Sequence, residues 1–315
     1  MGVKIMNCSI VIRAFNEAVY IGRLLEGIQH QTVQEVEIIL VDSGSTDSTV
    51  SIAESFGARI VHIRPEEFTF GRSLNLGVRA ATRDFVVIAS AHVYPVYPDW
   101  LECLLRPFDD DQVAVVYGKQ RGGEASKFSE RQIFHQWFPD MDVARQPGPF
   151  CNNANAAVRR SLWLGQPYDE SLTGLEDLAW ARGAQEQGYH VAYAAHAEIV
   201  HVHNETPRGV YNRYRREAMA FKQIHPEAHF NLYDFLRLTA ANILSDLWHA
   251  GRERLLWKNL APVFWFRFMQ FHGTRMGYRE SGLLTPQLRE TFYYARERKP
   301  KDGARRDVEP IRYEE

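Results

Sequence analysis

Polar residues that could bind a nucleotide follow three apolar runs of the sequence. These residues are Asn16 and Glu17, then Asp42, then Ser90, Ala91 and His92 as one small polar turn. Asp42 can accept a hydrogen bond from a base N–H or a ribose hydroxyl, and His92 can donate one to a phosphate oxygen. Just before Glu17, backbone and ring contacts to a base are available from Arg13, Ala14 and Phe15. Glu17 can equally serve as a first-turn acid of the following helix.

Two adjacent acids, Glu176 and Asp177, shortly after Gly174, open a predicted helix within residues 168–187. Transfer of a group to a hydroxyl needs a base that removes the hydroxyl proton, and a carboxylate can take that role. Acids at a helix N-terminus are also favoured by the helix dipole alone. The pair is therefore a candidate catalytic site with a structural alternative.

An amide-rich segment lies between the polar turn and the acid pair, and it contains Asn152, Asn153 and Asn155. Amide side chains both donate and accept hydrogen bonds, which suits contact with sugar hydroxyls of an acceptor or donor. A buried turn satisfied by its own amides is the alternative.

The elements that must position these residues alternate between strand and helix. Apolar runs predict strands at residues 8–12, 36–41, 58–63, 85–89 and 113–117, and helical spacing links several of them. Such alternation predicts a mostly parallel sheet flanked by helices, with ligands beyond the carboxyl ends of its strands. We expect a mobile loop over 118–129 and two short strands at 191–193 and 197–202.

The composition is that of an ordinary globular protein of 315 residues with a formal net charge of −2. This charge gives no reason to expect a nucleic-acid partner. The cysteines Cys8, Cys103 and Cys151 are scattered and fit a reducing compartment. Without a secretory signal or a run of about 18 apolar residues, we expect a cytoplasmic location, including the inner face of the cytoplasmic membrane.

The chain divides by composition into three parts. Residues 1–205 carry the strand and helix alternation, 206–295 are helical, aromatic and basic, and 296–315 form a charged tail predicted to be disordered. The segment 255–271 is dense in aromatic residues and is predicted to be broken at Pro262. Membrane-surface helices over 232–275 and a cap or homo-oligomer contact are both compatible with this pattern.

Five segments together resemble the family 2 glycosyltransferases, which have the GT-A fold and move a sugar from a nucleotide-sugar donor. The segments are CSIVIRAFNE, EIILVDSGSTDST, GRSLNLGVRAA, FVVIASAH and LTGLEDLAW. The resemblance covers about the first 205 residues. It implies a GT-A domain with a helical C-terminal extension, and a transferase that acts on a hydroxyl of a glycan or lipid-linked acceptor in surface polysaccharide synthesis.

The resemblance also implies roles for single residues. It places the base of an inverting displacement on Asp177, with Glu176 in support. It places Arg72 and Asn75 next to the donor sugar and pyrophosphate, where Arg72 could reach phosphate oxygens. The donor would be linked to UDP, GDP or dTDP.

This sequence departs from the family pattern at the metal site. Relatives carry Asp-x-Asp there, and this chain has Ser90, Ala91 and His92. Loss of two acids weakens a hard-oxygen site for Mg²⁺, but imidazoles can still bind Mn²⁺ or a softer ion. The family often adds a C-terminal histidine, which here implies His203 beside His92. A divalent metal, Mn²⁺ or Mg²⁺, is the expected cofactor.

Three alternatives remain open from the sequence. A CMP-linked donor carries one phosphate and needs no metal, so His92 could contact that phosphate directly. The lost acids also fit a non-catalytic nucleotide-sugar-binding scaffold. A nicotinamide-dependent oxidoreductase is disfavoured because no GxGxxG follows the first strand.

Overall fold

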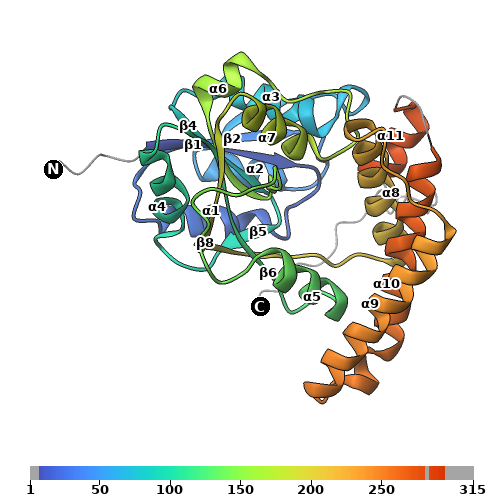
Figure 1. Cartoon of the computed structure of the whole chain (residues 1–315). Coiled ribbons are helices and arrows are strands. Elements are labelled where there is room, and N and C mark those ends of the chain that lie inside the picture. Colours follow the sequence, from blue (N-terminus) through green and yellow to red (C-terminus); the bar gives the residue numbers. More distant parts are fainter. Residues whose placement is uncertain (1–6, 281–283, 295–315) are drawn as a thin grey trace, which may run out of the picture.

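A mixed eight-stranded sheet forms the centre of the protein (Figure 1). The structure is a computed structural model and describes residues 7–280 and 284–294. The strands lie in the order β3-β2-β1-β4-β7-β6-β8-β5. Their bounds are β1 (Asn7–Ala14), β2 (Glu35–Asp42), β3 (Arg59–His62), β4 (Phe85–Ser90), β5 (Val93–Pro95), β6 (Val113–Gly122), β7 (Asn155–Arg159) and β8 (His190–His201).

Helices cover both faces of this sheet and continue beyond it. The N-terminal helices are α1 (Ile21–Gln29), α2 (Thr49–Ser55), α3 (Phe70–Ala80), α4 (Trp100–Leu105), α5 (Phe128–Trp137), α6 (Arg160–Gly165) and α7 (Glu176–Glu186), with short 3₁₀ turns at Pro65–Glu67 and Arg106–Asp109. The C-terminal helices are α8 (Pro207–Ile224), α9 (Leu232–Arg252), α10 (Leu256–Arg279) and α11 (Pro286–Tyr293).

Successive residues of β1 enter two different apolar clusters because side chains alternate across a strand. Ile10 and Ile12 pack into one cluster, and Val11 between them packs into the other. Close packing of α3 on β1 depends on Gly77, where an added Cβ would lie 2.3 Å from a methyl carbon of Val11. The apolar run therefore places the carboxyl end of β1 in the middle of the sheet.

The prediction of a mostly parallel sheet needs one refinement. β1, β2, β3 and β4 pair in parallel, as does β6 with β8, whereas β7 is antiparallel to β4 and β6, and β5 is antiparallel to β8. The expected strands at 8–12, 36–41 and 85–89 are confirmed as β1, β2 and β4.

Two predictions around β6 are wrong. The expected loop over 118–129 is mostly regular, since β6 continues to Gly122 and α5 begins at Phe128. The two short strands expected at 191–193 and 197–202 are one strand, β8. Register shifts between β6 and β8 let the long strands remain paired despite an irregular pattern of apolar residues.

The C-terminal helices lie together beside the sheet, and α9 with α10 projects beyond it (Figure 1). Helix α10 is continuous through Pro262, so the predicted break there is wrong. Tertiary packing outweighs the local cost of the proline: Val263 and Phe266 are buried, and added Cβ atoms at Gly273 and Gly277 would each lie 2.3 Å from a carbonyl oxygen of α8. The predicted disordered tail at 296–315 lies outside the described residues.

Candidate functional site

Three neighbouring parallel strands bring the predicted nucleotide-binding residues to one edge of the sheet. In the register of β1 with β2 and β4, Arg13 lies opposite Ser90, and Ala14 lies opposite Asp42. The polar ends of these strands are therefore next to one another, as the sequence predicts. Their side chains divide into an acidic cluster near α7 and an imidazole cluster near the end of β8.

Asp42 is buried and holds the turn that follows β2. Its carboxylate accepts hydrogen bonds from the backbone N–H groups of Gly44 and Ser45, at 3.1–3.2 Å. His62 lies beside it, with Nδ1 3.5 Å from the carboxylate. Asp47, just before the N-cap residue of α2, instead accepts from the backbone N–H of Thr49 at 2.9 Å. Asp42 thus holds the turn at the candidate nucleotide-binding edge, and contact with the nucleotide stays a prediction.

Aromatic rings from distant parts of the chain lie around the end of β1. Phe15 meets Tyr294 edge to face, with ring centroids 4.7 Å apart, and Phe70 meets Tyr293 at 5.0 Å. The guanidinium of Arg13 lies 4.4 Å from the centroid of Phe70. The end of α11, with Tyr293 and Tyr294, therefore returns to the nucleotide-binding edge, which was not predicted from the sequence.

The acidic cluster consists of Glu176 and Asp177 in the first turn of α7, with Arg13 and Asn153. Glu176 is buried and accepts from Arg13 at 3.5 Å and from the side-chain amide of Asn153 at 3.3 Å. Asp177 accepts from the backbone N–H of Asn153 at 3.0 Å and of Leu178 at 2.8 Å. The helix is preceded by Leu175 in the left-handed region, with φ 57°, which is costly for leucine.

Burial and the neighbouring charge of Glu176 raise the pKa of Asp177 to about 7, although Arg13 and the two backbone donors act in the opposite direction. A carboxyl with this pKa divides between its two forms near neutral pH. It can therefore accept a proton from a hydroxyl without being permanently protonated.

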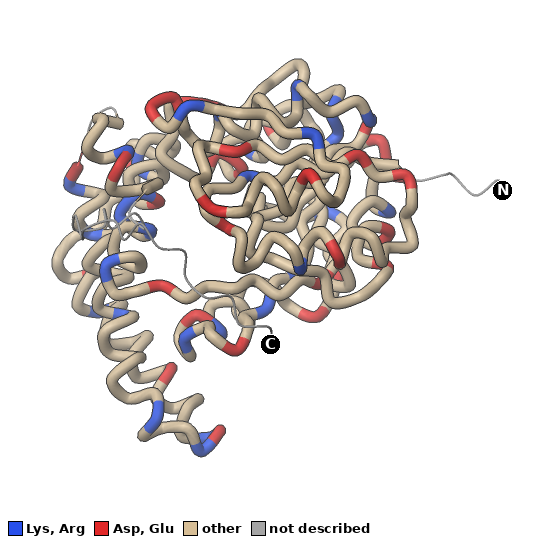
Figure 2. The backbone as a smooth tube through the Cα atoms, turned by 180° about the vertical axis from the view of Figure 1, so that it is seen from behind, with Lys and Arg blue, Asp and Glu red and all other residues tan. Residues whose placement is uncertain are grey.

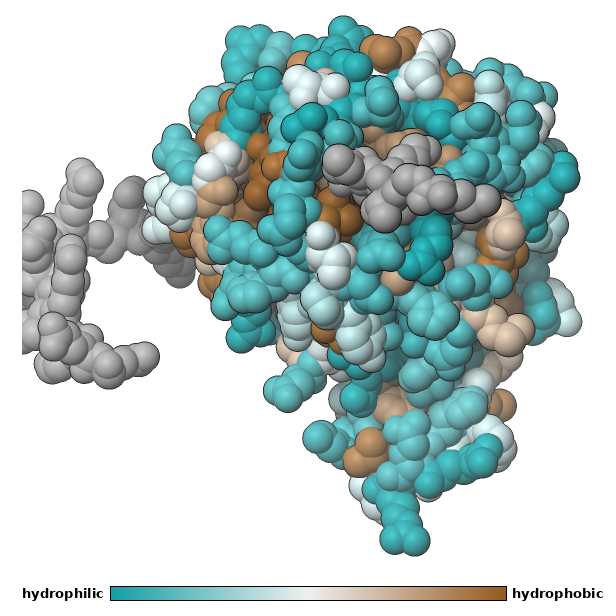
Figure 3. All heavy atoms as spheres, turned by 90° about the vertical axis from the view of Figure 1, so that its left-hand side faces the viewer, coloured by the Kyte–Doolittle hydropathy of each residue, from teal (hydrophilic) through white to brown (hydrophobic). Residues whose placement is uncertain are grey.

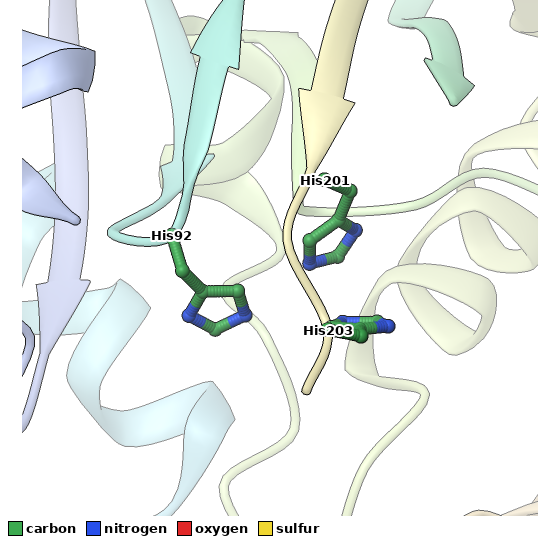
Figure 4. Close-up of side chains that lie close together, drawn as sticks. All are labelled: His92, His201 and His203. Atoms are coloured by element: carbon green, nitrogen blue, oxygen red, sulfur yellow. The ribbon is translucent and has the colours of Figure 1, made fainter. Parts of the chain in front are cut away.

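The imidazole cluster consists of His92, His201 and His203 (Figure 4). Its rings come from the turn after β4, from the last residue of β8, and from two residues further on. One potential ligand atom from each ring lies within 4.8 Å of the others. The structure thus brings together the predicted pair His92 and His203, and adds His201, whose ring centroid lies 5.1 Å from that of His92 and 3.9 Å from that of His203.

Each imidazole of this cluster has an oxygen partner at Nδ1. Glu17 lies 3.0 Å from His92, Gln120 lies 2.8 Å from His201, and Glu130 lies 2.6 Å from His203. Ser90 is close to His92 as well, with its Oγ 3.1 Å from Nε2. Burial lowers the pKa of His201 well below its usual value, so that ring is uncharged at neutral pH.

Arg72 and Asn75 of α3 are held by the segment before α7. Arg72 is half-exposed and pairs with Glu170 at 3.3 Å, and Glu67 lies 3.7 Å away. Asn75 is buried, donates to the Tyr168 carbonyl and to Glu170 at 2.9 Å, and accepts from the Tyr168 N–H at 3.0 Å. The side chain of Asn75 therefore connects α3 to this segment, and only Arg72 has solvent access for a phosphate.

The three asparagines of the amide-rich segment have different surroundings. Asn155 is fully buried; it accepts from the Trp100 indole at 2.9 Å and donates to the carbonyls of Lys119 and Ala197. Asn152 closes its own turn through the Ala154 N–H at 2.9 Å. For Asn155 the structural alternative fits because its amide is consumed inside the sheet, and the sugar contact stays a prediction. Asn153 borders the acid pair.

Several residues at the site were not predicted from the sequence. They are Gln120 and Glu130, Arg213 and Arg216, and Tyr293 and Tyr294. They lie on β6, α5, α8 and at the end of α11, all distant in the sequence from the motifs. Gln120 lies in the segment 118–129 that was expected to be a loop, so no local sequence signal indicated its place in β6.

A model of the glycosyl transferase family 2 matches residues 9–163. The chain belongs to this family. Its matched region contains β1 through β7, with Asp42 and His92. The acid pair and the other two histidines of the cluster lie beyond the matched residues.

Relatives of this family 2 glycosyltransferase include two proteins from Salmonella. The O-antigen chain rhamnosyltransferase WbaN of Salmonella anatum is 32% identical over 206 residues, which are 59% of this chain and 62% of the relative. The O-antigen chain rhamnosyltransferase RfbN of Salmonella typhimurium is 28% identical over 66% of this chain and 70% of its own length. The matched region thus spans less than two thirds of WbaN.

Solved structures show the GT-A fold. The mannosyltransferase PcManGT of Pyrobaculum calidifontis, in complex with GDP-Man and Mn²⁺, has a TM-score of 0.60 at 19% identity, over 87% of this chain and 88% of its own. TarS 1–349 of Staphylococcus aureus, in complex with UDP-GlcNAc, has a TM-score of 0.53 at 17% identity, over 82% and 90%. The predicted fold class is therefore confirmed.

Proposed function

We propose that this protein transfers a sugar from a nucleotide-sugar donor to a hydroxyl of a glycan or lipid-linked acceptor, with inversion at the anomeric carbon. The observation that carries this proposal is the acid pair. Asp177 is partly buried beside the buried Glu176 and has a pKa of about 7, close to the edge of the sheet where nucleotides bind in such folds. A proton acceptor and a nucleotide-binding edge are what sugar transfer to a hydroxyl requires.

In the proposed reaction, the acceptor oxygen attacks the anomeric carbon while the bond from that carbon to the phosphate oxygen breaks. The hydroxyl proton passes to a carboxylate oxygen of Asp177, and the nucleotide leaves with the bonding electrons. Glu176 keeps Arg13 at the site through their 3.5 Å contact and raises the proton affinity of Asp177 through its charge. Asn153 fixes the orientation of both acids.

The donor would lie along the ends of β1, β2 and β4. Arg13, Ala14 and Phe15 would line the base, Asp42 would contact the base or ribose, and Arg72 would reach the phosphates. Glu17 acts through His92, since its carboxylate lies 3.0 Å from that ring. The expectation of a donor contact for Asn75 is replaced by a structural role, because its amide is already bonded on both sides.

The family implies a divalent cation, and the relative PcManGT was solved with Mn²⁺. In this chain His92 and His203 would hold it, at the place where the leaving phosphate would lie. A bound cation would offset negative charge on the leaving group. A CMP-linked donor without a cation is the alternative, with His92 donating directly to one phosphate.

The names of the relatives suggest the sugar and pathway. Two are rhamnosyltransferases of O-antigen chains, so we infer that the product is a surface polysaccharide and that a rhamnosyl donor is the first to test. Residues 1–205 would form the catalytic domain and 206–295 a helical region attached to it. A non-catalytic scaffold that only binds nucleotide-sugars is the competing function.

The tip formed by the end of α9 and the start of α10 suits contact with a membrane surface. Trp248 is 58% exposed and Trp257 is 85% exposed. Basic residues gather at this tip (Figure 2), and apolar residues are interspersed with polar ones on the projection (Figure 3). Amphipathic aromatic rings next to arginines fit an anionic lipid head-group region. No helix in the described part of the chain is long and apolar enough to span a bilayer.

A donor panel tests the proposed function. Purified protein would be mixed with dTDP-rhamnose, GDP-mannose, UDP-GlcNAc or a CMP-linked sugar, with and without Mn²⁺, and a polyprenyl-linked oligosaccharide. Mass spectrometry should show the acceptor gaining one sugar from a diphosphate donor. Thermal shift would report donor binding separately, because a ligand of the native state raises the Tm. Binding without transfer for every donor and acceptor would favour the scaffold.

A further inference from the structure

The three imidazoles of the cluster are arranged with their Nδ1 atoms turned to oxygen partners. Those partners are Glu17, Gln120 and Glu130, at 3.0, 2.8 and 2.6 Å. A neutral imidazole that donates from Nδ1 has its lone pair on Nε2. The three partners therefore decide which nitrogen of each ring can bind a metal ion. In metal sites, such oxygen partners orient the histidine and raise the basicity of its ligand atom.

The polar contacts of His203 lie on one side of its ring. Nδ1 is 2.6 Å from a carboxylate oxygen of Glu130 and 3.1 Å from the guanidinium of Arg213. Nε2 lies on the other side of the ring and is the atom available to a cation.

His201 provides the observation that points to a ligand. Its side chain is more than nine-tenths buried, and its Nε2 has no hydrogen-bond partner among the residues that the structure describes. Leaving a buried polar nitrogen without a partner costs free energy, and native structures rarely do so without a ligand, water or ion. This nitrogen belongs to the cluster whose candidate ligand atoms lie within 4.8 Å of each other.

We propose that Nε2 atoms of His92, His201 and His203 form a three-imidazole site for one first-row transition-metal ion, of the kind represented by Zn²⁺ or Co²⁺, in preference to Mg²⁺. Imidazole nitrogen is a borderline ligand that suits these ions, whereas Mg²⁺ demands oxygen ligands. Three histidines with a fourth position open to another ligand is a known arrangement for a reactive Zn²⁺ site.

The distances and charges fit this assignment. A tetrahedral ion with nitrogen ligands at about 2.1 Å brings them to about 3.4 Å from one another, and the candidate ligand atoms lie within 4.8 Å of one another in the present structure. Arg213 lies 3.1 Å from His203 and would repel a cation. Glu130 and Glu205 each bind Arg213, at 2.9 and 3.0 Å, and so balance its charge.

This inference rests on the proposed function only for the purpose of the ion, which would face the leaving phosphate of the donor. Metal binding itself needs no donor. It also differs from the hard-oxygen site that the Asp-x-Asp of the family indicates, and it disfavours Mg²⁺, one of the two ions expected from the sequence. Glu17, Gln120 and Glu130 act as positioning residues, because they would touch the ligands and not the ion.

Cobalt binding to the full chain tests the proposal without any sugar nucleotide. Metal-free protein would be titrated with Co²⁺, and the visible ligand-field absorption would report both stoichiometry and geometry. We expect one Co²⁺ ion per chain, with an absorption spectrum typical of a low coordination number. An equimolar amount of Zn²⁺ should displace the Co²⁺, and a hundredfold excess of Mg²⁺ should leave the spectrum unchanged. Co²⁺ binding that Mg²⁺ abolishes, or no binding, would overturn the proposal.

Variants separate ligands from positioning residues. His201→Ala should weaken Co²⁺ binding by at least about 100-fold, and Glu130→Gln by about 10–100-fold, the range seen when an outer partner is lost. His196→Ala is the matched control, since it lies on the same strand β8 and its side chain is 75% exposed; binding should not change. If His201→Ala unfolds, His203→Ala should show the same loss. Unchanged binding in a folded ligand variant would refute the site.

Discussion

The acidic cluster and the imidazole cluster lie at the same edge of one sheet, but they solve opposite electrostatic problems. In the acidic cluster two carboxyls are adjacent, so burial and repulsion raise the pKa of Asp177 to about 7. In the imidazole cluster each ring has its own oxygen partner at Nδ1, and one nitrogen of each ring lies within 4.8 Å of the others. The first arrangement is suited to taking up a proton and the second to holding a cation or a phosphate.

The two clusters also differ in what supports them. Arg13 and Asn153 support the acids from the edge of the sheet itself. The imidazoles are supported from α5, which carries Glu130, and α5 is in turn held by the C-terminal helices. There, Arg267 binds Asp246 at 2.7 Å and reaches the Ser129 carbonyl at 3.4 Å. The helical extension is therefore part of the support for the imidazole cluster.

Replacing Asp177 gives the largest expected effect, and it should impair the acidic cluster while leaving the imidazole cluster unchanged. Asp177→Asn should lower the rate of sugar transfer by about 10²–10⁴-fold, the usual contribution of a general base. Nucleotide-sugar affinity should change little. The rate would be followed by product formation at saturating donor. Glu186→Gln, at the far end of α7 with a 64% exposed side chain, is the control; a similar loss in that variant would point to general damage to the helix.

Replacing His92 removes one of the three rings of the imidazole cluster and leaves the acidic cluster unchanged. His92→Ala should weaken metal-dependent binding of the nucleotide-sugar by about 10–100-fold, because one contact to the phosphate side of the donor is lost. Calorimetry with and without added metal would measure it. The pH dependence of transfer should keep its midpoint, since Asp177 is untouched. A shifted midpoint with unchanged affinity would mean that the two clusters are not separate.

The free energy of unfolding tests how much Glu130, which contacts the imidazole cluster from α5, contributes to stability. Glu130→Gln should lower the free energy of unfolding at pH 7 by about 2–4 kcal/mol, because Arg213 loses a buried partner. The pKa of Glu130 is depressed to about 2 in the folded protein. Its contribution is therefore present above its unfolded value of about 4.3 and is lost as pH falls toward 2. Urea unfolding of the unmodified protein and of Glu130→Gln should show that the difference between their free energies of unfolding becomes smaller as the pH falls from about 4.3 toward 2. A difference that does not change with pH would contradict the depressed pKa of Glu130.

The smallest expected effect is at the exposed tip. Trp257→Ala should change the free energy of unfolding by no more than about 0.5 kcal/mol, because the side chain is 85% exposed. It should leave transfer to a water-soluble acceptor unchanged and weaken sedimentation with anionic phosphatidylglycerol vesicles. Equal vesicle binding by the unmodified protein and by Trp257→Ala would mean that the tip of α9 and α10 does not bind a membrane through Trp257.

The sequence predicted the part of the site that is local to strand ends. Arg13, Asp42 and His92 each follow an apolar run, so their common edge follows from the alternation of strands and helices. The acid pair was singled out because transfer to a hydroxyl needs a base and because the family resemblance places that base on Asp177, shortly after Gly174. His203 was predicted through the family resemblance. Its neighbour His201 joins the cluster because it is the last residue of β8.

The remainder depends on long-range packing that local patterns do not encode. Asn155 looked like a sugar contact, but its amide joins β6, β8 and α4 in the core. Glu130 follows the segment 118–129 that was expected to be a loop, and only the fold places it 2.6 Å from His203. Continuity of α10 through Pro262 is likewise decided by its contacts with α8 and α9.

The pH dependence of sugar transfer tests the central claim most directly, namely that the acidic cluster handles the proton. Because the base must be ionised, the rate at saturating donor should rise with pH, with a midpoint near 7, and level off above it. Glu176→Gln removes the negative charge beside Asp177, so its pKa should fall and the midpoint should move to lower pH. A rate that is flat between pH 5 and 9, or an unmoved midpoint in Glu176→Gln, would contradict the account.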